Sequence, residues 1–132
     1  MLCCHFLVSN KSMNNPIKRL TEQLITFRNE RDWQQFHKPK DLAISLTLEA
    51  AELLELFQWK TDAEITHMVQ HHPEKLRDEL ADVFNWILVL SHDCNIDILA
   101  ASTAKIEKNK QKYPIEKAKG KHTKYTEFTR DE

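Results

Sequence analysis

Four acidic residues stand in two pairs with helical spacing, and each pair lies within an otherwise apolar stretch. The pairs are Glu49-x-x-Glu52 and Glu79-x-x-Asp82. Carboxylates gathered in apolar surroundings repel one another and resist burial unless a cation neutralises them. Hard divalent ions such as Mg²⁺ take oxygen ligands and are commonly held by a few carboxylates together with substrate phosphates. The pattern therefore predicts metal-assisted chemistry on a phosphate ester.

The composition favours a single helical domain. The chain has 132 residues, of which 41% are hydrophobic and 30% charged, with one glycine and four prolines. So few turn-forming residues favour long helices with short connections over a β-rich fold. The formal net charge of -1 gives no overall attraction to nucleic acid or to an anionic membrane. A polyanion would have to be bound locally, so we expect neither a nucleic acid polymer nor a membrane as partner.

The cysteines and the apolar segments indicate a soluble, reduced, cytoplasmic protein. Cys3, Cys4 and Cys94 are an odd set without CxxC spacing, so neither a disulfide framework nor a zinc ribbon is predicted. No apolar run approaches the roughly 18 residues that a membrane span needs. We expect residues 1–14 to be a disordered leader, and Met13 is a second candidate for the start of translation.

Periodicity and capping signals predict an all-α protein with a four-helix-bundle core. The expected principal helices are 16–29, 41–57, 73–94 and 98–113, and a short extra helix covers 62–69. Asn15, Thr61 and Asp97 stand where N-caps are expected. The segment 32–40 breaks the helical period and is expected to be an ordered loop with exposed aromatic side chains. The helical domain is then 15–114, and 115–132 is a polar tail or arm.

A helical wheel at about 100° per residue distinguishes Glu49 from ordinary surface acids. Glu49 falls inside the apolar stripe of its helix, whereas Glu52 lies on the flank of that stripe. The stripe consists of Leu42, Leu46, Leu53 and Leu56. On the later helix, Trp86 lies in angle between Glu79 and Asp82, one turn further on. The four acids could also be solvated surface charges, or part of a stabilising ion-pair network with Arg77 and Lys105.

Further motifs accompany the acidic pairs and carry a family resemblance. They are Trp33-Gln34-Gln35-Phe36-His37, Glu55-Leu-Phe-Gln-Trp59 and Lys105-x-x-x-Asn109-x-x-x-Tyr113-Pro114. With these motifs, over roughly residues 16–127, the chain resembles the MazG-like all-α nucleotide pyrophosphohydrolases. Among them it is most similar to the dCTP pyrophosphatase branch.

The resemblance implies an enzyme that hydrolyses a nucleoside triphosphate between the α and β phosphorus, in nucleotide-pool housekeeping. It implies Mg²⁺ as cofactor and a homodimer or homotetramer whose active sites are built at the subunit interface. The implied metal ligands are Glu49, Glu52, Glu79 and Asp82. The implied base and sugar pocket consists of Trp33, Gln34, Gln35, Phe36, His37, Trp59 and Trp86.

Residue chemistry is consistent with that reaction. A carboxylate that is not fully committed to metal can take the proton of the attacking water, and Glu52 is our candidate. Lys105 can neutralise the leaving group, and Asn109, one turn away, can donate to a phosphate or sugar oxygen. Trp33 and Trp59 can sandwich a base, each stack being worth about 1–3 kcal/mol.

Two positions depart from the dCTP pyrophosphatase pattern. That branch tends to carry a histidine where this chain has Leu24, and often a tyrosine where it has Trp86. Leucine cannot read a base edge by hydrogen bonding, so a broader base preference is expected.

Two other function classes compete with this one. A ferritin-like di-iron bundle requires Glu-x-x-His pairs, and neither acidic pair ends in histidine. A non-catalytic helical module that binds a nucleotide or a partner remains the alternative hypothesis. His67 and His71 have zinc-compatible spacing but lack the glutamate of HExxH, so they are interpreted as surface histidines.

Overall fold

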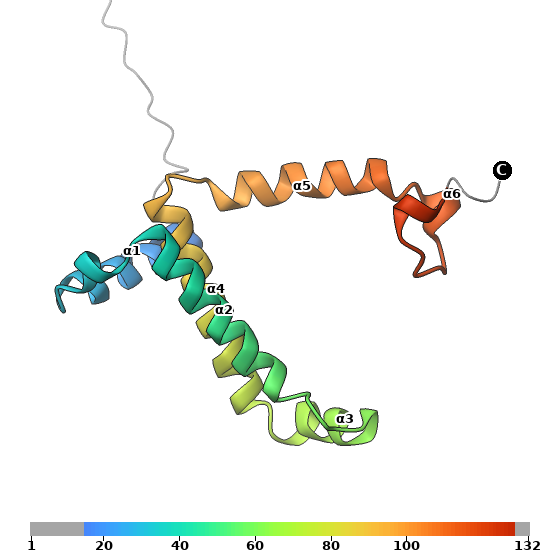
Figure 1. Cartoon of the computed structure of the whole chain (residues 1–132), viewed down its shortest axis with the longest axis horizontal. Helices are drawn as coiled ribbons and strands as arrows, with labels where there is room; N and C mark the ends of the chain where they lie inside the picture. Colours follow the sequence, from blue (N-terminus) through green and yellow to red (C-terminus); the bar gives the residue numbers. More distant parts are fainter. Residues whose placement is uncertain (1–14, 129–132) are drawn as a thin grey trace, which may run out of the picture. The chain divides into compact units, whose positions relative to one another are not determined.

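The structure, a computed structural model, describes residues 15–128, and every regular element in that range is helical (Figure 1). The predicted all-α class is thus confirmed, while the expected leader 1–14 and the end of the tail, 129–132, lie outside the described residues. The elements are α1 (Pro16–Asn29), η2 (Trp33–Phe36), α2 (Pro39–Glu55), α3 (Asp62–His71), α4 (Glu74–Asp93), α5 (Ile98–Lys112), α6 (Ile115–Ala118) and η3 (Tyr125–Glu127). None of the helices described is long and apolar enough to cross a membrane.

Helix starts follow the local capping signals. The Asn15 side chain accepts hydrogen bonds from the backbone N–H groups of Ile17 and Lys18, and Asp97 accepts from Ala100. Thr61 and Glu64 form the predicted reciprocal capping box. The hydrogen bonds that Thr61 donates through its backbone and side chain lower the pKa of Glu64.

Several helix boundaries differ from the prediction by one or two residues. α2 begins at Pro39 rather than at residue 41, because proline fits the first turn of a helix, where no N–H partner is needed. α2 ends at Glu55, and Trp59 in the following turn has a positive φ of 66°. Pro73 is the N-cap of α4 rather than its first residue. Of the segment 32–40, predicted as an ordered loop, residues 32–38 form a connection that contains the short 3₁₀ helix η2, and the last two residues belong to α2.

The described residues divide into two compact units between Cys94 and Asn95, the first covering 15–94 and the second 95–128. In the first unit, α2 and α4 pack side by side and α1 packs against α4 (Figure 1). Their buried apolar side chains are Leu42 on α2 with Leu88 and Val89 on α4. The first unit therefore packs three of the four predicted principal helices, and the fourth, α5, belongs to the second unit.

The second unit consists of α5 and the chain that follows it. The Tyr113 ring, directly after α5, makes edge-on contacts with Tyr125 at 5.6 Å and Phe128 at 5.9 Å between ring centroids. Lys112 Nζ lies 4.9 Å from the centroid of Tyr125. The described part of the segment predicted as a polar tail thus contains two short helices and packs by aromatic contacts on the end of α5.

Candidate active site

Three of the four predicted metal ligands come together between α2 and α4. Glu49 on α2 and Glu79 and Asp82 on α4 each place a carboxylate oxygen within 4.8 Å of the others. The fourth predicted ligand, Glu52, is exposed and stands outside this mutually close group. Its charge nevertheless acts on Glu79 more strongly than any other neighbouring charge.

Electrostatics shows that this acidic cluster lacks an internal counter-charge. Partial burial raises the pKa of Glu79 first, and the negative charges of Glu52, Asp82 and Glu49 raise it further. Within residues 15–94, no lysine or arginine forms an ion pair with any of the four acids. The stabilising ion-pair network that the sequence left open is therefore not formed in this unit. A divalent cation would relieve the repulsion that raises this pKa.

Trp86 joins the acidic cluster to the neighbouring aromatic residues. Its indole Nε1–H donates a hydrogen bond to Glu49 Oε1 at 3.2 Å. The His37 ring lies against the indole, with 5.4 Å between ring centroids and 54° between the planes. The wheel placed Trp86 beside Glu79 and Asp82 on its own helix; its hydrogen bond runs instead to Glu49 on the neighbouring helix.

A pocket of about 460 Å³ opens beside the acidic cluster. Glu49 and Asp82 belong both to its wall and to the cluster, while Trp33, His37 and Trp86 supply aromatic surface. The remaining lining residues are Leu24, Phe27, Arg28, Asn85 and Val89. The volume lies within the range of small-molecule sites, which are mostly apolar with a few placed polar groups.

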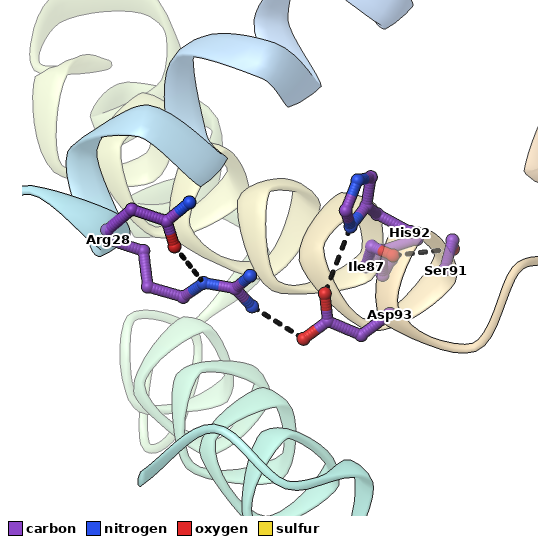
Figure 2. A network of polar contacts seen from close by, with 6 residues as sticks. Arg28, Ile87, Ser91, His92 and Asp93 are labelled. Atoms are coloured by element: carbon purple, nitrogen blue, oxygen red, sulfur yellow. Dashed lines mark hydrogen bonds and ion pairs between the residues drawn. The ribbon is translucent and has the colours of Figure 1, made fainter. Parts of the chain in front are cut away.

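A buried ion pair joins Arg28, which lines the pocket, to Asp93 at the end of α4 (Figure 2). Arg28 is 3% exposed, and its Nη1 donates to Asp93 Oδ2 at 2.5 Å. His92 Nδ1 lies 3.0 Å from Asp93 Oδ1. Burial alone would raise the pKa of Asp93, but the hydrogen bonds from His92 and Arg28 outweigh it and lower that pKa. The pair ties α1 to α4 and fixes the Arg28 side chain in the pocket wall.

His37 lines this pocket and has one ring nitrogen without a partner. Among residues 15–128, its buried Nδ1 has no hydrogen-bond partner. Burial lowers the pKa of His37, the positive charge of Arg28 lowers it further, and Asp93 opposes the shift. The lowered pKa favours the neutral form of the ring, whose Nδ1 has no partner. Buried polar atoms are normally paired, so a bound molecule would explain this exception.

The other predicted site residues are not among those that line this pocket. The helix η2 carries Gln34, Gln35 and Phe36, none of which is among the lining residues, and the Phe36 side chain is 64% exposed. Trp59 is 92% exposed in the turn between α2 and α3. Lys105 and Asn109 lie on α5 in the second unit. The roles of all six residues stay predictions.

The comparisons with known proteins agree with this arrangement. The model of the MazG-like family matches residues 44–128, a range that contains both acidic pairs and Trp86. The chain belongs to the MazG-like family. The predicted resemblance is thereby confirmed, and the cluster between α2 and α4 lies within the matched MazG-like region.

Curated relatives and a solved structure place the chain near pyrophosphatases. It is 41% identical over 106 residues to dCTP pyrophosphatase 1 of Rattus norvegicus, a match that covers 79% of this chain and 62% of the relative. It is 36% identical over 125 residues to dCTP pyrophosphatase 1 of Bos taurus, covering 93% of this chain and 72% of the relative. A solved pyrophosphatase from Archaeoglobus fulgidus DSM 4304 matches with a TM-score of 0.72 and 37% identity, over 76% of this chain and 94% of that one. The chain thus spans 62% of the length of the rat relative.

Proposed function

We propose that this MazG-like protein is a nucleoside triphosphate pyrophosphohydrolase of the nucleotide pool. Its substrate would be a dNTP, either dCTP or a related dNTP. It would cleave this substrate between the α and β phosphorus and release the monophosphate and pyrophosphate. The observation that carries this proposal is the shared wall: Glu49 and Asp82 belong both to the acidic cluster and to the aromatic pocket. A base in the pocket would therefore place its polyphosphate beside the carboxylates.

We propose Mg²⁺ as the cofactor, held by Glu49, Glu79 and Asp82 with Glu52 at the edge. The donor set fits a hard cation, because it consists of carboxylate oxygens without nitrogen or sulfur. When bound, Mg²⁺ would neutralise and orient the polyphosphate and lower the pKa of a coordinated water. Glu52 stands outside the close group of oxygens, which leaves its carboxylate free to take the proton of the attacking water.

The pocket residues are proposed to hold the base. Trp33 and Trp86 offer flat apolar surfaces, and the free Nδ1 of neutral His37 offers a hydrogen bond. Leu24 lines the same pocket without a polar atom, which supports a base preference broader than cytosine alone. Lys105 and Asn109 are proposed to contact the leaving phosphates.

We propose that the protein works as a homodimer or homotetramer in the cytoplasm. Apolar side chains at i,i+4 spacing stay exposed on the two central helices: Ile44 (51%) and Leu48 (58%) on α2, and Leu80 (50%) and Phe84 (39%) on α4. Such stripes favour burial against another copy. Trp59, exposed in the single chain, would then complete a site at the subunit interface.

The test is product analysis with a panel of nucleoside triphosphates, with and without Mg²⁺. We expect pyrophosphate and monophosphate, no turnover in EDTA, and loss of turnover in Glu49→Gln and Asp82→Asn with helicity retained. Glu55→Gln, an exposed acid on the same helix as Glu49, is the matched control and should keep wild-type turnover. Orthophosphate as the product would contradict the proposal. Binding of nucleotide without any turnover would favour the non-catalytic module.

A further inference from the structure

The Trp86 indole has one polar hydrogen, and a proposed metal ligand accepts it. The Nε1–H donates to Glu49 Oε1 at 3.2 Å across the α2–α4 interface. Indole is a hydrogen-bond donor without an acceptor. Engaged in this way, the side chain has no polar group left for a sugar or a base, so its remaining contribution to a ligand is its apolar face.

Packing fixes the orientation of the indole ring, and the hydrogen bond in turn restricts the Glu49 carboxylate. Trp86 is partly buried, its ring packs on His37, and both residues line the pocket. A ring held by packing keeps its N–H direction, and a fixed donor restricts the rotation of the carboxylate that it bonds. Glu49 sits among like charges, with Glu79 and Asp82 oxygens within 4.8 Å. Without a restraint, repulsion would turn the Glu49 carboxylate away from them.

We propose that Trp86 is a positioning residue for the metal site: its indole N–H holds the Glu49 carboxylate toward Glu79 and Asp82, so that the cluster is assembled before a cation arrives. This inference rests on the proposed function, because it assumes that the acidic cluster binds a divalent cation. It assigns to Trp86 a role distinct from base binding. Partners of metal ligands typically change metal affinity by about 10- to 100-fold when they are removed.

The inference is tested by the affinity for Mn²⁺, a paramagnetic substitute for Mg²⁺, measured without nucleotide by electron paramagnetic resonance. Trp86→Phe keeps an aromatic ring against His37 but removes the donor, and should weaken Mn²⁺ binding about tenfold. Trp33→Phe is the matched control, because Trp33 lines the same pocket and contacts Phe27 rather than a carboxylate. It should leave the Mn²⁺ affinity within about twofold of wild type.

A double-variant comparison separates positioning from general loss of packing. If Trp86 acts through Glu49, then Trp86→Phe should weaken Mn²⁺ binding much less in a Glu49→Ala background, which has no acceptor for the indole N–H, than in the wild type. An equal weakening in both backgrounds, or none in the single variant, would overturn the inference.

A spectroscopic measurement keeps the test decisive if Trp86→Phe does not fold. The indole N–H signals of the ¹⁵N-labelled wild-type protein are assigned with Trp33→Phe and Trp59→Phe, which identifies Trp86 by elimination. Adding Mg²⁺ without nucleotide should shift the Trp86 signal more than the other two, and an unmoved signal would overturn the inference. Intact Mg²⁺-dependent turnover with unaffected Mn²⁺ binding in Trp86→Phe would refute only the role of Trp86. Failure of the wild type to bind Mn²⁺ would refute both this role and the proposed metal site.

Discussion

Removing the charge of Asp93 should destabilise the first unit more than any surface charge change. Asn at this position cannot neutralise the Arg28 guanidinium, which is 3% exposed. Deleting one partner of a buried ion pair typically costs about 3–5 kcal/mol, because the other charge stays buried and uncompensated. The Asp93 side chain is 17% exposed, and Asn can still accept one hydrogen bond. We therefore expect Asp93→Asn to lower the free energy of unfolding by about 3 kcal/mol, the lower end of that range.

The assay is urea unfolding followed by circular dichroism at one fixed protomer concentration, because self-association would make stability concentration-dependent. The matched control is Glu22→Gln. Glu22 pairs with Lys18 on α1 at 4.0 Å, with the side chains 64% and 60% exposed. Such exposed pairs contribute less than about 1 kcal/mol. The pKa of Asp93 is lowered, so the wild-type contribution is fully present at neutral pH and is lost only as the pH falls through that lowered pKa.

Two results would refute the reasoning on this pair. A cost of Asp93→Asn no larger than that of Glu22→Gln would mean that Arg28 is not held in a desolvated site. The second result would come from the double variant Arg28→Met with Asp93→Leu. Removing both charges should recover most of the loss, because replacing a buried pair by apolar side chains is often close to neutral. A double variant less stable than Asp93→Asn would show that packing, not the unpaired charge, sets the cost.

Three further predictions concern the pocket and one helix start. Leu24→His adds a polar atom to the pocket wall and should raise the ratio of kcat/KM for dCTP over the other dNTPs by about tenfold; an unchanged ratio would contradict our account of base preference. Burial and the charge of Arg28 hold the pKa of His37 in the folded protein below its ordinary value of 6.5. As the pH falls, the unfolded chain therefore binds a proton at His37 before the folded protein does, and the free energy of unfolding decreases. His37→Phe should therefore lose less unfolding free energy than wild type between about pH 7.5 and about pH 5.5, and equal losses would argue against a buried neutral ring. Thr61→Ala removes the cap of α3 and should cost about 1 kcal/mol in urea unfolding, whereas Thr66→Ala, on the same helix but outside the cap, should cost less.

The helices of this chain could be predicted because their signals are local. Asn15, Thr61 and Asp97 each satisfy backbone N–H groups two or three residues ahead, and such a bond depends on little beyond the neighbouring sequence. The start of α2 is less certain from sequence, because Lys38-Pro39 also suits the end of a loop. Proline serves equally well as the first residue of a helix, and Pro39 is the first residue of α2.

The site was only partly predictable, because it depends on how two helices lie against each other. The wheel placed Glu49 on the apolar face of its helix, and the structure brings it to Glu79 and Asp82. A wheel describes one helix at a time, so it could not show that Trp86 would bond Glu49 rather than its helical neighbours. Arg28 and Asp93 were missed because 65 residues separate them. The sequence did contain one sign that Arg28 is buried. It follows Leu24 by four residues and therefore lies on the same, apolar side of α1.

The central claim, that the acidic cluster directs water to the α-phosphorus, is tested most directly by isotope labelling. The reaction is run in ¹⁸O-labelled water with Mg²⁺ and dCTP, and the products are analysed by mass spectrometry. We expect one ¹⁸O atom in the monophosphate and none in the pyrophosphate, with no labelled product in EDTA. The ¹⁸O atom in pyrophosphate would place the attack at the β-phosphorus and contradict the account.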